Sequence, residues 1–221
     1  MNGRPNKKNN DNEIEITDSV YDKREVISDE GIEISGEGKA IRGETTGGGV
    51  VYLLIDGSGS MSGDNLVQAK KGTIGFAEEA WRKNYSVGLI QFASTATFIC
   101  EPERESSVLS EQLEKIKAEG DTNMTDAILL VIEKLRNNGG NKVIVIITDG
   151  KPNNSVTALA AADQAKENGI DIITIGTDDA DTEFLRKIAT RTDLAVMVPR
   201  KNLEKGITAS AKMLPMLPMG K

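Results

Sequence analysis

Residues 50–63 read Val-Val-Tyr-Leu-Leu-Ile-Asp-Gly-Ser-Gly-Ser-Met-Ser-Gly, and they decide the fold class. The first six are an unbroken apolar run, which is typical of a strand buried on both faces of a parallel sheet. The next eight, apart from Met61, are small or polar, and their glycines permit a tight turn. Apolar residues at helical spacing then predict a helix over residues 64–83. A buried strand, a tight loop and a helix in this order indicate an α/β fold.

The same alternation of strand and helix repeats along the rest of the chain. Five further strands are predicted, at residues 85–92, 95–101, 143–148, 170–175 and 194–198. Five further helices are predicted, at residues 106–118, 124–138, 155–168, 181–190 and 202–214. Only a short Ala-Ser link separates the second and third strands, so these two are predicted to pair antiparallel. We therefore predict a doubly wound α/β domain: a mostly parallel six-stranded sheet with one antiparallel edge strand and helices on both faces.

A polar, acidic leader, residues 1–46, precedes this domain. It contains two short alternations of Ile with Glu, at residues 13–17 and 31–35. These are compatible either with weak strands, as a small ribbon or at a sheet edge, or with a leader that is partly disordered. A Thr-Thr-Gly-Gly-Gly linker follows. We therefore assign residues 47–214 to the domain and expect residues 215–221 to fray as a tail.

The composition excludes several kinds of chemistry. The chain has no histidine and one cysteine, Cys100, which removes Ser–His–Asp and Cys–His nucleophiles and zinc sites of the Cys/His kind. It carries 27 Lys+Arg against 34 Asp+Glu, a net charge of −7, and this disfavours binding to nucleic-acid phosphates. No run reaches the roughly 18 apolar residues of a membrane helix, and residues 1–12 lack the apolar core of a secretory signal. We therefore expect a cytoplasmic protein without membrane insertion, since one cysteine also forms no internal disulfide.

Oxygen-bearing side chains gather in three loops that follow strands or precede helices, at residues 56–63, 119–124 and 149–154. In a doubly wound sheet the site lies beyond the carboxyl ends of the strands, so these loops are expected to meet. The candidate metal-ligating residues are Asp56, Ser58, Ser60, Thr122 and Asp149. Carboxylate and hydroxyl oxygens are hard ligands, which suit Mg²⁺, Mn²⁺ or Ca²⁺ better than zinc.

These three pieces together resemble the von Willebrand factor A (VWA) family. The chain has Asp-x-Ser-x-Ser at residues 56–60, Gly-x-Thr at 120–122 and Ile-Thr-Asp-Gly at 147–150, in the family's order. The resemblance covers residues 48–214. Within the family, the chain resembles bacterial stand-alone intracellular members. It implies a Rossmann-like VWA fold with a complete metal-ion-dependent adhesion site (MIDAS). One departure is Asp121, where the family often has glycine; a carboxylate there either faces solvent or lowers the attraction for an acidic partner.

The resemblance also implies a role for each site residue. The hydroxyls of Ser58 and Ser60 would ligate the ion directly, and Thr122 would do so directly or through water. Asp56 and Asp149 would hold the coordinated waters. The expected ion is Mg²⁺, with Mn²⁺ or Ca²⁺ as alternatives. Because neutral hydroxyls leave much of the divalent charge uncompensated, an open coordination position would attract an Asp or Glu of a partner protein.

The leading functional hypothesis is therefore a non-enzymatic, metal-dependent protein-binding module. A second is a regulatory or chaperone-like subunit of an ATPase or kinase/phosphatase assembly, such as those of tellurite-resistance-type stress systems, which the resemblance to stand-alone bacterial members implies. A third is a metal-assisted phosphohydrolase, in which Asp56 and Asp149 hold Mg²⁺. This third hypothesis lacks a general base, and Lys151 is the one cation at these loops that could clamp a phosphoryl group.

Two further patterns receive structural interpretations. The glycines of the first loop miss the dinucleotide-binding spacing by one residue, and the Gly-Lys-Ser/Thr of a phosphate loop is absent there. The acidic run at residues 178–181 could suggest a second metal cluster, but a helix is predicted to begin there. Acidic residues favour helix N-termini through capping and the helix dipole. We therefore expect this run to cap a helix.

Overall fold

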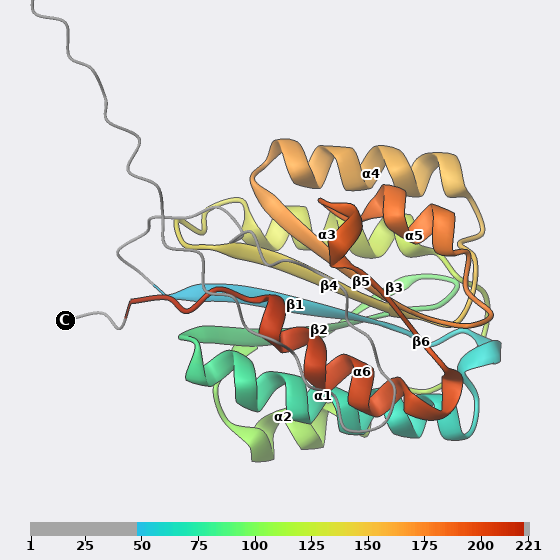
Figure 1. The fold of residues 1–221 in the computed structure, drawn as a ribbon, viewed down its shortest axis with the longest axis horizontal. Helices are drawn as coiled ribbons and strands as arrows, with labels where there is room; N and C mark the ends of the chain where they lie inside the picture. Colours follow the sequence, from blue (N-terminus) through green and yellow to red (C-terminus); the bar gives the residue numbers. More distant parts are fainter. Residues whose placement is uncertain (1–47, 219–221) are drawn as a thin grey trace, which may run out of the picture.

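The computed structural model describes residues 48–218, which form one six-stranded sheet (Figure 1). The strands are β1 Gly49–Asp56, β2 Tyr85–Phe92, β3 Ala96–Glu103, β4 Lys142–Thr148, β5 Ile170–Thr177 and β6 Ala195–Val198. Their order across the sheet is β3-β2-β1-β4-β5-β6, and every neighbouring pair is parallel except β2 with β3, which is antiparallel. The predicted doubly wound fold with one antiparallel edge strand is confirmed.

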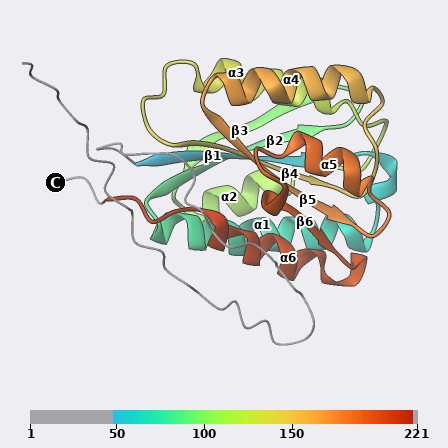
Figure 2. The same cartoon turned by 45° about the horizontal axis from the view of Figure 1, so that its top comes forward.

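Helices cover both faces of this sheet (Figure 2). They are α1 Asp64–Arg82, α2 Ser106–Leu113, α3 Met124–Leu135, α4 Ser155–Glu167, α5 Thr182–Ile188 and α6 Leu203–Ser210. The core on one face draws on α1, α2 and α6, and the core on the other face draws on α3, α4 and α5. Within residues 48–218 no helix combines the length and the apolar character that crossing a membrane would require.

The central strand β1 explains why its sequence is apolar without interruption. Val51, Leu53 and Ile55 point into the core beneath α1, whereas Tyr52 and Leu54 point into the opposite core beneath α3. All five are at most 1% exposed. Successive side chains of a strand point to opposite faces, so a strand covered on both sides needs apolar residues at every position.

Helix α2 ends at Leu113, five residues before the predicted end. Ile116, beyond the helix, is 1% exposed, so the chain turns inward to bury it. Glu119 N–H then donates to the Gly57 carbonyl at 2.7 Å, and Gln91 Nε2 donates to the Lys117 carbonyl at 2.6 Å. The two bonds bring residues 117–119 to the carboxyl ends of β1 and β2. The predicted last turn of the helix is therefore replaced by a segment that tertiary contacts position.

Up to Pro218, the end of the chain packs against the domain, which differs from the frayed tail that the sequence predicts. Leu217 is 4% exposed, and its N–H donates to the Lys83 carbonyl at 3.2 Å. Asn84, in the left-handed region at φ 68°, donates from Nδ2 to the Pro218 carbonyl at 2.6 Å. A Cβ at Gly49 would lie 2.2 Å from Cε1 of the buried Tyr85 ring and 2.9 Å from Leu217 Cδ1, so the close approach of the Tyr85 ring requires glycine. These contacts hold the tail at the amino end of β1, whereas residues 219–221 and the predicted leader lie outside the described residues.

Candidate metal centre

Three loops meet beyond the carboxyl ends of β1 and β4, which are neighbouring parallel strands. Gly59 N–H donates to the Gly120 carbonyl at 3.1 Å, which joins the first loop to the second. Thr122 N–H donates to Asn153 Oδ1 at 3.0 Å, and Asn153 N–H donates back to the Thr122 carbonyl at 3.0 Å, which joins the second loop to the third. β1 pairs with β2 on one side and with β4 on the other, and the strand order changes direction between β1 and β4. The loops at the carboxyl ends of these two strands therefore lie at the switch point of the sheet.

Asp56 ends β1 and is fully buried, at 0% exposure. Its Oδ1 accepts a hydrogen bond from Ser58 N–H at 2.8 Å, and its Oδ2 accepts one from the Thr148 hydroxyl at 2.5 Å. Burial raises the pKa of Asp56, and these hydrogen bonds offset the effect only in part. Asp56 is therefore a desolvated carboxyl group at the carboxyl end of the central strand β1, where a nearby cation would stabilise its charged form.

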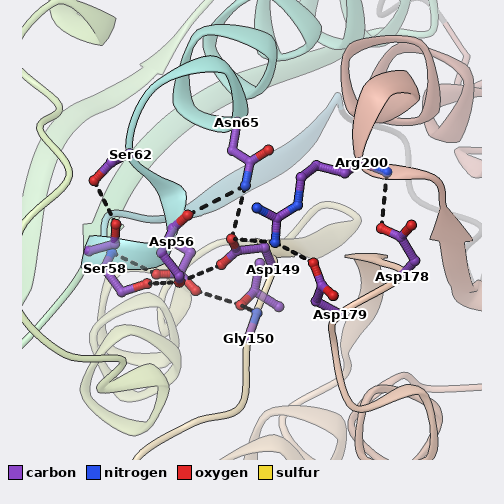
Figure 3. Close-up of polar contacts among 12 residues, drawn as sticks. Asp56, Ser58, Ser62, Asn65, Asp149, Gly150, Asp178, Asp179 and Arg200 are labelled. Atoms are coloured by element: carbon purple, nitrogen blue, oxygen red, sulfur yellow. Dashed lines mark hydrogen bonds and ion pairs between the residues drawn. The ribbon is translucent and has the colours of Figure 1, made fainter.

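Asp149 follows β4 and shares a hydrogen-bonded network with the first loop (Figure 3). Ser58 Oγ lies 3.0 Å from Ser60 Oγ, and Ser60 Oγ donates to Asp149 Oδ1 at 2.7 Å. The other carboxylate oxygen, Oδ2, accepts from Asn65 Nδ2 at 3.0 Å. The side chain of Asp149 is 0% exposed. Two carboxylates and two hydroxyls, from loops 89 residues apart in sequence, are thus brought together by direct contacts.

Thr122, which precedes the N-cap residue Asn123 of α3, is 8% exposed. Its backbone is fixed by Asn153, but its hydroxyl forms no hydrogen bond to any residue in the range 48–218. Four of the five predicted site residues are thus linked by direct hydrogen bonds, and Thr122 is linked to them through the loop backbone. The ligand roles that the family resemblance implies for the five residues remain predictions.

The donor set fits a hard divalent cation. It consists of two buried carboxylates and three hydroxyls, so every side-chain donor is oxygen. In the described part of the chain no group of three or more His, Cys, Asp or Glu residues could hold a metal, so an ion here would need the hydroxyls as well as the carboxylates. Mg²⁺, Mn²⁺ and Ca²⁺ accept such mixed oxygen ligands, with water completing the shell. The unpartnered Thr122 hydroxyl and the desolvated Asp56 carboxylate are both groups that a cation would satisfy.

Four residues that complete the site were not singled out from the sequence: Asn65, Thr148, Asn153 and Arg200. Asn65 carries a usable signal, because it is a polar residue on the buried side of the first turn of α1. Thr148 lies within the Ile-Thr-Asp-Gly motif and could have been inferred from it. Asn153 and Arg200 are positioned by tertiary contacts, and no local pattern marks them.

Two acidic residues near Thr122 are exposed and form no hydrogen bond or ion pair with the network described above. Asp121 is exposed, in keeping with the first of its two sequence interpretations. Asp126 is also exposed, and its Oδ2 accepts from Asn123 Nδ2 at 2.7 Å. Asn123 Oδ1 in turn accepts from Asp126 N–H at 3.3 Å, so the pair braces the start of α3.

The acidic run at residues 178–181 caps and anchors neighbouring elements. Asp181 accepts from Phe184 N–H at 3.1 Å and caps α5, and this hydrogen bond lowers the pKa of its carboxyl. Asp178 accepts from Arg200 N–H at 3.1 Å, and Asp179 pairs with the Arg200 guanidinium. The structural interpretation of this run agrees with these contacts.

Comparison with known proteins matches this architecture. The family model described as von Willebrand factor type A domain matches residues 51–208. The human collagen alpha-6(VI) chain is 30% identical over 151 residues, which cover 63% of this chain and 6% of that much longer one. The match therefore reports on a domain and not on the whole relative.

Three solved structures, at identities that inform on the fold alone, are also similar. The von Willebrand factor type A structure from Catenulispora acidiphila has a TM-score of 0.66 and 18% identity, over 76% of this chain and 43% of that one. Mussel byssus proximal thread matrix protein 1 with a zinc-occupied MIDAS motif has a TM-score of 0.58 and 18% identity, over 75% and 46%. The manganese-loaded Plasmodium vivax TRAP protein has a TM-score of 0.61 and 20% identity, over 75% and 74%. Since the family model spans nearly all of the sheet and its helices, the chain belongs to the von Willebrand factor type A domain family.

Proposed function

We propose that this chain is a divalent-metal-dependent protein-binding module that docks an acidic residue of a partner protein at the site formed by Asp56 and Asp149. Domains of the VWA family generally act as metal-dependent adhesion or protein-interaction modules. The observation that carries the proposal is the hydrogen-bonded network from Asp56 through Ser58 and Ser60 to Asp149. This network lies at the switch point of the sheet, where ligands of doubly wound folds bind, and it contains four of the five residues that the family resemblance predicts as ligands.

The ion would be held by the hydroxyls of Ser58, Ser60 and Thr122 together with the carboxylates of Asp56 and Asp149. Mg²⁺ is the first candidate because all of these donors are hard oxygens, and Mn²⁺ or Ca²⁺ shares this preference. Relatives of known structure carry zinc in one case and manganese in another, so the proposal concerns a class of ion with Mg²⁺ as its first member. Bound there, the ion would supply the positive charge that attracts a partner's carboxylate.

We infer that the site binds without catalysing a reaction. The chain has no histidine, and its one cysteine, Cys100, is buried in β3, where burial raises the pKa of the thiol. The nearby cations are already engaged, since Lys151 lies 3.4 Å from Asp181 and Arg200 pairs with Asp179. Each of these two cations shares its charge with a carboxylate, which lowers its capacity to stabilise the charge of a transferring phosphoryl group.

The first experiment is calorimetric titration of Mg²⁺, and separately of Mn²⁺, into the EDTA-treated full chain. The wild type is expected to bind one equivalent, and Asp149→Ala is expected to bind none. Asp163→Asn, a carboxylate of α4 paired with Lys166 at 3.2 Å on the protein surface, is the matched control and should bind like the wild type. Absence of binding by the wild type, or unchanged binding by Asp149→Ala, refutes the proposal.

The partner is sought by affinity capture with mass spectrometry, in Mg²⁺ and in EDTA. A protein that docks through a carboxylate on the ion should be retained in Mg²⁺ and lost in EDTA. Identification of an ATPase, kinase or phosphatase would support the predicted subunit role, which has no separate structural observation in its favour. A partner insensitive to EDTA would place the interface away from the metal site.

A further inference from the structure

Arg200 places a positive charge at the rim of the metal site (Figure 3). It begins a short 3-10 turn that follows β6, and its backbone N–H donates to Asp178 Oδ1 at 3.1 Å. Its guanidinium Nη2 pairs with Asp179 Oδ2 and lies 3.7 Å from Asp149 Oδ2. The residue is therefore held by the loop after β5 while its charge faces a carboxylate of the site.

The contact between Arg200 and Asp149 is an ion pair and not a hydrogen bond, because 3.7 Å exceeds hydrogen-bonding distance. Both oxygens of Asp149 already accept hydrogen bonds, from Ser60 at 2.7 Å and Asn65 at 3.0 Å. The Asp149 side chain is 0% exposed and that of Arg200 is 45% exposed. The guanidinium thus supplies charge to a buried carboxylate whose geometry is fixed by other groups.

The two site carboxylates differ in this respect. Among the ion pairs formed within residues 48–218, only the one made by Arg200 reaches either of them, and it reaches Asp149 but not Asp56. A divalent ion held by the site would experience both the attraction of Asp149 and the repulsion of the nearby guanidinium. An approaching carboxylate would be attracted by both cations, and arginine offers several N–H donors suited to a carboxylate.

We propose that Arg200 is a tethered cation that sets the balance between metal binding and ligand binding at this site. It balances part of the Asp149 charge when no ion is present, weakens the hold on the ion, and strengthens the binding of a partner's carboxylate once the ion is in place. This inference rests on the proposed function, because it assumes that the site takes a divalent ion.

A purely structural role gives a different expectation. If Arg200 only ties the turn after β6 to the loop after β5, its removal lowers the melting temperature and leaves the affinity for the ion unchanged. If it acts by charge, its removal raises the affinity. The guanidinium is 45% exposed, so a water-like dielectric of about 80 applies to it, and at separations of roughly 6–8 Å a unit charge then changes the affinity of a divalent ion about 5- to 10-fold at low salt and about 2- to 3-fold at physiological salt.

The test is calorimetric titration of Mg²⁺ and Mn²⁺ into the full-length wild type, Arg200→Gln, Arg200→Lys and Arg136→Gln. Arg136 is exposed and follows the last residue of α3, about 18 Å along the helix from its start near the site, so Arg136→Gln changes the net charge equally at a distant position. We expect Arg200→Gln to bind both ions about 5- to 10-fold more tightly at low salt, with a smaller ratio at high salt. Arg200→Lys and Arg136→Gln should stay within about 2-fold of the wild type.

The ligand half of the inference is tested with acetate as the probe. Acetate is titrated into the Mn²⁺-loaded proteins while the water-proton relaxation enhancement is followed, and Arg200→Gln is expected to bind acetate several-fold more weakly than the wild type. A wild type that binds neither ion refutes the proposed function itself. A wild type that binds normally, with Arg200→Gln unchanged in metal or acetate affinity, overturns this inference alone; a lowered melting temperature in that case assigns the residue a structural role.

Discussion

Replacing Asp56 with asparagine should separate the fold from the metal site. The side chain is fully buried, so the substitution must keep its shape, and asparagine differs from aspartate only in charge and in one hydrogen-bonding group. Asn Oδ1 can still accept from Ser58 N–H, now 2.8 Å from Asp56 Oδ1. The amide Nδ2 can donate to the Thr148 hydroxyl, which reverses the bond that Thr148 now donates to Oδ2.

The expected loss concerns the stabilisation that the ion provides. At a free Mg²⁺ concentration 100 times its dissociation constant, binding stabilises the wild type by about 2.7 kcal/mol. For a domain of this size that corresponds to a rise in melting temperature of roughly 5–11 °C. Removing a unit charge at roughly 5 Å from a divalent ion weakens binding a hundredfold or more at an effective dielectric of about 40. The same Mg²⁺ concentration should then raise the melting temperature of Asp56→Asn by less than about 2 °C.

Without metal, the melting temperature of Asp56→Asn should be at least as high as that of the wild type. Burial raises the pKa of Asp56 in the folded state, so folding favours the protonated carboxyl group. The stability that this group contributes is fully present below the ordinary carboxyl pKa range, and it is lost as the pH rises through the pKa of the folded state. Asp56→Asn removes this loss and should melt no lower than the wild type near neutral pH in EDTA. Differential scanning fluorimetry with and without Mg²⁺ measures both effects, and Asp163→Asn is the control with a full Mg²⁺ shift. An Asp56→Asn protein that keeps the full shift, or that unfolds in EDTA, would refute the reasoning.

Three further predictions address pH, packing and the chain end. Because burial raises the pKa of Asp56, Mg²⁺ affinity measured by calorimetry should begin to fall, as the pH is lowered, at a higher pH than an exposed aspartate would cause; a fall that begins only in the ordinary carboxyl range contradicts this. Gly88→Ala should destabilise the fold by about 1–3 kcal/mol in urea denaturation, since its Cβ would lie 2.4 Å from the Tyr52 ring on the adjacent strand, and an unchanged midpoint would show that the ring yields freely. Leu217→Ala should cost about 2–3 kcal/mol, because Leu217 is 4% exposed, whereas the exposed Met216→Ala should cost under about 0.5 kcal/mol; equal effects would mean that the tail is not packed.

The sequence predicts most of the fold because the signals for this sheet are local. Strands covered on both faces need unbroken apolar runs. Residues 50–55 form such a run, which can be recognised without reference to any other part of the chain. The ends of α2 and of the tail are set by contacts with distant residues. Ile116 and Leu217 become buried only when the sheet is formed, so no local pattern places them.

The candidate site divides in the same way. Asp56, Ser58 and Ser60 share one loop, and the fold rule for strand ends brings Asp149 beside them. Arg200 lies 51 positions beyond Asp149 in the sequence, after a strand of only four residues, and its role depends on the loop at Asp178 and Asp179. A charge that acts through space leaves no spacing in the sequence by which it could be recognised.

The charges around the site imply that partner binding depends on the ion. Asp56 and Asp149 are both buried at the proposed docking point, and the charge of Arg200 is shared with Asp149 and Asp179. Without an ion an incoming carboxylate would therefore meet a site of net negative charge, on a chain whose overall charge is −7. A divalent ion cancels this negative charge and presents a cation to the incoming carboxylate without changing the shape of the site, because the network that holds the carboxylates is formed within the protein. A chelator should consequently release an acidic partner completely from this site, and not merely lower its affinity.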